Sequence, residues 1–163
     1  MCGCRLWPHS LTSFELRPVF VLMSPFLVSS TGRPRLLCVD DNRDFADSLV
    51  MLLNMCGFDA YACYDGPSAL ERSRECLPEL CFIDLNMPGM DGDELAIRLR
   101  ELAGERSISL VAVTAMSSES AYDRTAGAGF TRHLVKPPDP AKLLQIAIEL
   151  APPPVLVTPS IST

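Results

Sequence analysis

The stretch ELCFIDLNMPGMDGDELAIRLRELAG, from Glu79 to Gly104, contains the pattern that decides the fold. It starts with an apolar run that ends in Asp84, which predicts a buried strand. After an Asn-Met-Pro-Gly turn, Asp91 and Glu94 form a capping-box-like start for a helix, and Gly104 closes that helix. The stretch therefore predicts a buried strand, a tight turn and a helix in direct succession.

The same succession of strand and helix recurs on both sides of this stretch. Apolar or alternating runs predict further strands, and runs with helical periodicity predict further helices. The predicted strands are Arg35–Asp40, Asp59–Tyr64, Glu79–Asp84, Ile108–Ala115 and Arg132–Lys136. The predicted helices are 44–57, 67–77, 93–104, 117–129 and 141–150. Strands that are each followed by a helix predict an α/β fold with a parallel sheet covered by helices on both faces.

Two of the predicted helices have an apolar face that should pack on the sheet. In helix 44–57, which stops at Gly57, this face is formed by Phe45, Leu49, Leu52 and Cys56. Helix 141–150 is capped by Asp139 and opened by Pro140. Its apolar face is formed by Leu143, Ile146, Ala147 and Leu150.

The composition is that of one globular domain with extensions. The chain has 163 residues, of which 48% are hydrophobic and 21% are charged, and its net charge is -6. An acidic chain of this kind is poorly suited to bind nucleic acid directly, so we expect no such binding. The 7 cysteines are odd in number and form no CxxC motif, and only 2 histidines accompany them. They are typical of reduced thiols, which predicts a cytoplasmic protein.

The chain divides into three zones: an N-terminal extension (1–33), a dense central domain (34–150) and a Pro-rich tail (151–163). In the first zone, the apolar run Val19–Val28 is interrupted by Pro25 and is shorter than the about 20 residues that span a bilayer. We therefore expect no membrane span, and favour a flexible or mis-started extension, with initiation at Met23, over an export signal. The tail carries no charged side chain and should be disordered.

Polar side chains stand at or just after the ends of four predicted strands: Asp40 and Asp41, Asp84, Thr114, and Lys136. The carboxyl ends of parallel strands share one rim of the sheet, where ligands bind in such folds. Three carboxylates at one rim raise one another's pKa unless cations neutralise them, and Lys136 supplies only one positive charge. An oxygen-preferring divalent ion is the natural remainder, and Mg²⁺ fits this role. The absence of His and Cys from these strand ends disfavours zinc.

This set of residues predicts phosphoryl transfer. A carboxylate can attack phosphorus to give an acyl phosphate, and the transferring group needs a metal and hydrogen-bond donors on its oxygens. We expect Asp84 to be the nucleophile, with Mg²⁺, Lys136 and Thr114 on the phosphoryl oxygens and the backbone carbonyl of Asn86 on the metal. The other acids of the stretch should favour the dipole of the following helix: Asp91, Asp93 and Glu94.

The motifs VDDN, DLNMPGMDG, VTA and HLVKP, in this order, resemble the four signatures of the response regulator receiver domain. The resemblance covers about Arg35 to Leu150. It implies a flavodoxin-like, doubly wound (βα)5 fold with strand order 2-1-3-4-5, in a single-domain protein similar to the chemotaxis regulators of two-component systems. It also implies a histidine kinase or a histidine phosphotransfer protein as phosphodonor.

The resemblance also implies a role for each site residue. Asp84 becomes the phosphoacceptor, and Mg²⁺ is held by Asp41, Asp84 and the Asn86 carbonyl, with Asp40 acting through water. Thr114 and Lys136 contact the phosphoryl oxygens, and Lys136-Pro137 resembles a cis peptide bond of the family that aims the lysine inward. Such a domain assists its own phosphorylation and dephosphorylation but is not an enzyme. Because the tail is too short for an output domain, we expect it to signal by contact with an unidentified downstream protein.

Two departures from the family pattern bear on regulation. His133 stands where the family has its switch aromatic, so that Thr114 and His133 form the expected switch, and Pro138 follows Pro137. A histidine merely packed at a sheet edge is the alternative. Met116 cannot position an attacking water as a polar side chain would, which predicts slow loss of the phosphoryl group.

Other functions fit less well. An EF-hand loop starting at Asp84 would need an oxygen ligand and an acid where Pro88 and Leu95 stand. A phosphatase of the haloacid dehalogenase class would need a second acid where Asn86 stands. Two alternatives to a phosphorylated switch remain: a phosphorelay intermediate that passes the phosphoryl group to a histidine, and a degenerate receiver that acts only as an interaction module.

Overall fold

Strands and helices alternate along the computed structural model of the chain, which describes residues 32–115 and 125–152. The strands are β1 (Arg35–Val39), β2 (Asp59–Cys63), β3 (Leu80–Ile83), β4 (Ser109–Thr114) and β5 (Arg132–Val135). The helices are α1 (Arg43–Met55), α2 (Gly66–Glu75), α3 (Gly92–Ala103) and α5 (Pro140–Leu150). Each strand lies within the range predicted for it, and no strand end differs from its predicted position by more than one residue.

The strands form one 5-stranded sheet in the order β2-β1-β3-β4-β5, as the resemblance implied. Every neighbouring pair is parallel. Val39 pairs with Ile83 in β3, and Ile83 pairs with Ala112 in β4, so the carboxyl ends of these strands reach the same edge. This confirms the α/β, flavodoxin-like fold and places the ends of the strands where a site can form.

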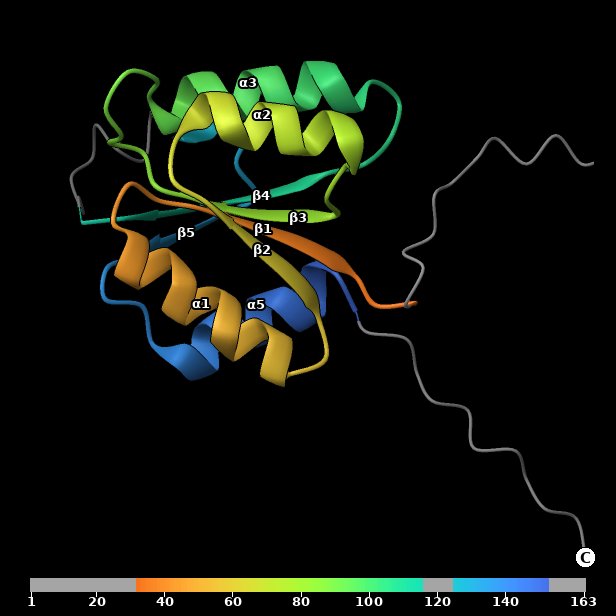
Figure 1. Ribbon diagram of the computed structural model, residues 1–163, viewed down its shortest axis with the longest axis vertical. Helices are drawn as coiled ribbons and strands as arrows, with labels where there is room; N and C mark the ends of the chain where they lie inside the picture. The colour runs from red at the N-terminus through yellow and green to blue at the C-terminus, as the bar shows by residue number, and fades with distance from the viewer. Residues whose placement is uncertain (1–31, 116–124, 153–163) are drawn as a thin grey trace, which may run out of the picture.

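Helices cover both faces of the sheet, with α2 and α3 on one face and α1 and α5 on the other (Figure 1). Alternate residues of β1 enter different core clusters: Leu37 and Val39 pack on the α2 and α3 side, whereas Leu36 and Cys38 pack on the α1 and α5 side. Successive side chains of a strand point to opposite faces. A central strand must therefore be apolar at consecutive positions, which is why these strands are continuous apolar runs.

The buried face of α1 differs from the predicted one, which was Phe45, Leu49, Leu52 and Cys56. The buried residues are Ala46, Leu49 and Leu53, and Cys56 is exposed. The sequence carries two overlapping apolar stripes, and the packing of α1 on the sheet selects the one centred on Leu49. The helix also ends at Met55, so that Cys56 is the C-terminal cap. The prediction for Cys56 was therefore wrong.

The predicted cap residues stand at the ends of their helices, but one of the predicted capping hydrogen bonds does not form in the described part of the chain. Asp139 caps α5 and accepts a hydrogen bond from Ala141 N at 3.0 Å. Asp91 is the N-terminal cap of α3, but no capping hydrogen bond to its side chain occurs within the described residues, so the capping box is incomplete. Gly104 ends α3 with a φ of 59°, a conformation that favours glycine. In α5, Leu143, Ile146 and Ala147 are buried as predicted, and Leu150 is half-buried.

Some predictions concern segments that the structure does not describe. Of the predicted helix 117–129, only 125–129 is described, and 125–127 is helical. Met116 and most of the two extensions, 1–31 and 153–163, lie outside the described residues. Within residues 32–115 and 125–152, no helix is long and apolar enough to cross a membrane.

Candidate functional site

The site begins where β1 and β3 end side by side. Asp40 directly follows β1, and its backbone N–H donates to Cys63 O at 3.1 Å. Asp84 directly follows β3, and its N–H donates to Val39 O at 2.9 Å. These bonds continue the parallel ladder by one residue and hold both aspartates at the sheet edge. Asp40 is 3% exposed and Asp84 is 8% exposed, so both carboxylates are largely withdrawn from solvent.

A third carboxylate completes the cluster. One oxygen each of Asp40, Asp41 and Asp84 lies within 4.8 Å of the other two, and Asp41 is exposed. These carboxylates offer hard oxygen ligands at the ends of two strands, and the Asp41 carboxylate is open to solvent. They form a donor set of the kind that Mg²⁺ prefers. Opposite ligands of an octahedral Mg²⁺ lie about 4 Å apart, a separation comparable with the spread of this cluster. The residues present therefore fit a magnesium ion.

Lys136 supplies the positive charge of the site. Its Nζ lies 2.5 Å from Asp40 Oδ2 and 2.8 Å from Asp84 Oδ2, and its side chain is 19% exposed. The Lys136-Pro137 bond is cis, as the resemblance implied, and Lys136 N donates to Thr114 O at 2.9 Å. The structure thus brings together Asp40, Asp84 and Lys136, which the strand ends alone had predicted.

Burial and the ion pairs act in opposite directions on the charged groups. Burial raises the pKa of Asp40, and the hydrogen bond and charge of Lys136 only partly offset this increase. Burial lowers the pKa of Lys136, but its hydrogen bonds to Asp40 and Asp84 outweigh that effect, so its pKa is raised. Lys136 therefore stays protonated at neutral pH. Its one charge leaves the three carboxylates with a net negative charge that a divalent cation can neutralise.

Thr114 and Asn86 are connected to residues of this cluster, whereas His133 lies in the neighbouring strand β5. Thr114 is the last residue of β4 and is 0% exposed. Asn86 is exposed, and its backbone N–H donates to Asp84 Oδ1 at 3.4 Å. His133 pairs with Ala112 in the edge strand β5 and is half-buried. The metal contact of the Asn86 carbonyl and the switching role of His133 remain predictions.

The acids that follow the turn belong to α3. Asp91 caps the helix, and Asp93 and Glu94 lie in its first turn, where negative charge favours the helix dipole. Glu94 also forms an ion pair with Arg98 at 2.6 Å, with both side chains about half exposed. The metal cluster among the described residues does not include them. This arrangement agrees with their predicted structural role.

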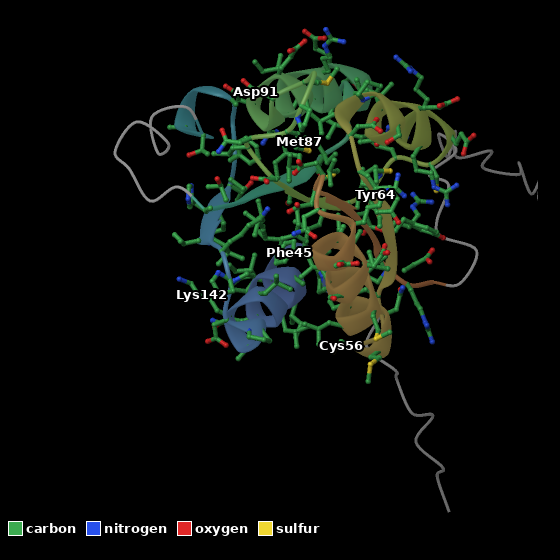
Figure 2. All side chains as sticks on the ribbon, turned by 60° about the vertical axis from the view of Figure 1, so that its left-hand side comes forward. Phe45, Cys56, Tyr64, Met87, Asp91 and Lys142 are labelled. Carbon is green, nitrogen blue, oxygen red and sulfur yellow. The ribbon has the colours of Figure 1, made fainter. Side chains whose placement is uncertain are left out.

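Sequence reasoning missed two residues that shape the site. A Cβ on Gly92 would lie 2.1 Å from the backbone oxygen of Asp84, so only glycine lets α3 start this close to Asp84. The ring centroid of Phe45 lies 4.8 Å from Lys136 Nζ. Phe45 belongs to the first turn of α1 (Figure 2). The glycine in MDGDEL could have signalled the close approach of Gly92 to Asp84. No sequence pattern marks the contact of Phe45 with Lys136.

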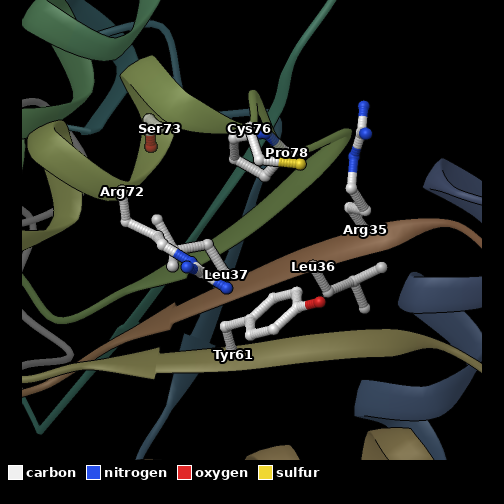
Figure 3. A pocket seen from close by; sticks show the side chains of 8 residues that line it. All are labelled: Arg35, Leu36, Leu37, Tyr61, Arg72, Ser73, Cys76 and Pro78. Atoms are coloured by element: carbon white, nitrogen blue, oxygen red, sulfur yellow. The ribbon is translucent and has the colours of Figure 1, made fainter. Parts of the chain in front are cut away.

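A pocket lies at the start of β1, at the end of the strand opposite to the carboxylates. Figure 3 shows Arg72 lying over the ring of Tyr61, and the guanidinium carbon is 4.4 Å from the ring centroid. Arg35, Cys76 and Pro78 form other parts of its wall. The cavity volume is about 10 Å³, which is barely enough for one water molecule. This pocket is therefore too small to be the functional site.

The chain is similar to known proteins over this same region. A family model described as the response regulator receiver domain matches residues 36–148. The transcriptional regulatory protein PrrA of Mycobacterium leprae is 37% identical over 112 residues, which cover 67% of this chain and 46% of PrrA. An uncharacterized 14.6 kDa protein of Leptolyngbya boryana is 35% identical over 111 residues, which cover 68% of this chain and 85% of that protein.

A solved structure agrees on the fold. The chemotaxis protein CheY4 of Vibrio cholerae superposes with a TM-score of 0.68 at 24% identity, covering 72% of this chain and 98% of that one. At this identity the likeness concerns the fold alone. The chain spans about half the length of the mycobacterial regulator it matches.

Proposed function

The chain belongs to the response regulator receiver domain family, and from this premise we propose that it accepts a phosphoryl group on Asp84. The donor is a phosphohistidine of a histidine kinase or of a histidine phosphotransfer protein, and the reaction takes place in the cytoplasm. Phosphorylation changes the conformation of the domain, which then signals by contact with another protein. The domain turns over no separate substrate, so we do not class it as an enzyme.

One observation carries the proposal. The Lys136 ammonium lies between the buried carboxylates of Asp40 and Asp84, at 2.5 and 2.8 Å, beside the solvent-exposed carboxylate of Asp41. A purely structural ion pair would need one carboxylate, and two would already be an excess of negative charge. Three clustered carboxylates, two of which share one ammonium, favour a site that also takes up a divalent cation and a phosphoryl group.

The proposed reaction uses the observed orientation of Asp84. A carboxylate oxygen of Asp84 attacks phosphorus, and the O–P bond forms as the N–P bond of the phosphohistidine breaks. The released imidazole keeps the electron pair of that bond and takes up a proton. Asp84 Oδ2 accepts from Lys136, and Oδ1 lies 3.4 Å from Asn86 N, so the carboxylate is oriented before the donor arrives.

The neighbouring residues stabilise the transferred group. The Lys136 ammonium and the Thr114 hydroxyl donate to phosphoryl oxygens, where negative charge accumulates during the transfer. Mg²⁺, when bound by Asp41, Asp84 and the Asn86 carbonyl and supported by Asp40 through water, supplies a further positive charge on one phosphoryl oxygen. With Thr114 engaged by the phosphoryl group, His133 in the neighbouring strand is the proposed second member of the switch.

A direct test uses a small acyl phosphate as donor. The wild-type protein, incubated with the donor and Mg²⁺, should gain the mass of one phosphoryl group, and Asp84→Asn should gain none. Asp91→Asn is a matched control, because Asp91 is exposed and asparagine is an equally good helix cap. Failure of the wild-type protein to gain mass would contradict phosphorylation and favour an interaction module.

The role of the phosphorylated protein needs a second experiment. In a switch, the phosphorylated form captures a protein that Asp84→Asn does not capture. In a phosphorelay, the phosphorylated form loses its phosphoryl group to a histidine phosphotransfer domain, and the receiving histidine becomes labelled. Slow spontaneous dephosphorylation, as predicted from Met116, would suit either role.

A further inference from the structure

We propose that Phe45 is a positioning residue for Lys136, and that its aromatic face holds the ammonium in place as the charges around it change. This inference rests on the proposed phosphorylation of Asp84. It assigns to α1, which supplies none of the predicted phosphoryl or metal contacts, a direct part in arranging the site.

The contact is a cation–π interaction between two elements. Lys136 Nζ lies 4.8 Å from the centroid of the Phe45 ring, within the about 6 Å over which a ring attracts an ammonium. The ring is half-buried, and the lysine side chain is 19% exposed. Such contacts are stronger when water is partly excluded from the cation.

The backbone of Phe45 is tied to the same turn that orients Asp40. Asn42 N donates to Asp40 Oδ1 at 3.1 Å, and Asn42 Oδ1 accepts from Phe45 N at 3.2 Å. Asn42 is thus both the N-terminal cap of α1 and the link between the carboxylate and the ring. The two groups that flank the ammonium are therefore fixed by one short segment of backbone.

Phe45 also borders a small space that both Asp40 and Asp84 line. Apolar side chains complete the lining, among them Leu49, Phe82 and Val113. The ammonium thus contacts two carboxylates at strand ends and an aromatic ring from α1. Without the ring, Lys136 would lose this electrostatic contact.

The ring matters most after phosphoryl transfer begins. Asp84 then gives up carboxylate charge to the new O–P bond, and a bound Mg²⁺, supported by Asp40 through water, would draw Asp40 away from Lys136. Both ion pairs of Lys136 weaken at the step in which its ammonium must bind a phosphoryl oxygen. Among its contacts in the described residues, the Phe45 ring is the partner whose charge does not change.

The test compares aromatic and aliphatic side chains of similar size. The rate of phosphorylation by a small acyl phosphate with Mg²⁺ is measured for the wild type, Phe45→Leu and Phe45→Tyr, with thermal unfolding as a check of folding. Phe45→Leu should lower the rate by roughly three- to thirtyfold, the range expected for loss of a partly desolvated cation–π contact. Phe45→Tyr keeps the aromatic face and should stay within about twofold of the wild type.

Matched variants separate positioning from packing. Phe130→Leu removes another half-buried phenylalanine, which packs in a different cluster, and should leave the rate unchanged. If Phe45→Leu unfolds, Phe45→Met takes its place as an unbranched aliphatic replacement. A Phe45→Leu rate within twofold of wild type, or a Phe45→Tyr rate as low as that of Phe45→Leu, would overturn the inference. A wild-type protein that takes up no phosphoryl group at all would instead overturn the proposed function.

Discussion

Lys136 Nζ lies 2.5 Å from Asp40 Oδ2, although β3 and β4 separate the strands that these residues follow. The lysine side chain therefore reaches along the carboxyl edge of the sheet to the end of β1. Its second contact, with Asp84 at 2.8 Å, lies at the end of β3. One ammonium thus connects three strand ends, and its removal affects both the stability of the domain and its proposed chemistry.

Replacement of Lys136 by methionine should destabilise the protein in the absence of divalent ions. Asp40 and Asp84 would then lie close together, largely buried, and without their cation. Breaking a fully buried ion pair costs about 3–5 kcal/mol, and because this lysine is partly exposed we expect a loss of about 2 kcal/mol in the free energy of unfolding. Urea unfolding at pH 7 measures it.

Lys142→Met provides the control for this loss. Lys142 is exposed on α5, and its replacement should change the free energy of unfolding by less than about 0.5 kcal/mol. A Lys136→Met protein as stable as wild type would show that the ammonium does not stabilise the two carboxylates.

The raised pKa of Asp40 predicts a specific pH dependence. Burial raises this pKa above the ordinary value of 3.8, so the folded state binds the proton more tightly than the unfolded state does. The stability gained from the protonated carboxyl is present below the ordinary value and is lost as the pH rises through the raised pKa. The stability of wild type relative to Asp40→Asn should therefore fall as the pH rises from about 3.8 toward neutrality.

Urea unfolding of both proteins across this range, with a chelator present, measures the difference. Asp40→Asn removes the titration but keeps a side chain of the same size, so the titration of other acids largely cancels. A difference that increases with pH would mean that the ion pair with Lys136, rather than burial, dominates the pKa of Asp40.

Magnesium should stabilise the folded protein. A ligand that binds only the folded state at about 100 times its Kd adds about 2.7 kcal/mol to the free energy of unfolding. Thermal unfolding with Mg²⁺ and with a chelator should show this increase for wild type and little of it for Asp41→Asn. Asp44→Asn, an exposed acid in the first turn of α1, is the control and should respond as wild type does. Equal responses of the two variants would place the ion elsewhere.

The sequence predicted the parts of the fold and site that depend on order along the chain. Alternating strands and helices indicated a parallel sheet, and the polar residues at strand ends indicated the cluster of Asp40, Asp84 and Lys136. The strand order itself came from the resemblance of four motifs to a known family, since apolar runs alone do not say which strands are neighbours.

The missed features depend on how separate elements meet. The burial of α1 follows from its rotation on the sheet, which selected Leu53 over Cys56 although both fit an apolar stripe. The contact of Phe45 with Lys136 joins the first turn of α1 to the end of β5. Helical periodicity cannot choose between neighbouring stripes, and it holds no information about distances to other elements.

Gly92 should be the least replaceable glycine near the site. A Cβ at this position would lie 2.1 Å from the Asp84 backbone oxygen and 2.9 Å from Leu85 Cα, and these backbone atoms can only yield if the turn after β3 moves. Gly92 N also donates to Leu85 O at 2.9 Å, a bond that this movement would disturb. We expect Gly92→Ala to lower the free energy of unfolding by about 2 kcal/mol or more, because the added methyl group overpacks a buried contact.

Phosphorylation of Asp84 in Gly92→Ala should also slow by at least about tenfold, since small displacements of reacting groups reduce rates steeply. Gly127→Ala is the control, because no described atom lies within 4 Å of a Cβ at that position, and it should leave both quantities unchanged. Measurement of urea unfolding and acyl phosphate labelling for both variants decides the matter, and a Gly92→Ala protein that behaves like Gly127→Ala would show that the start of α3 does not fix the position of Asp84.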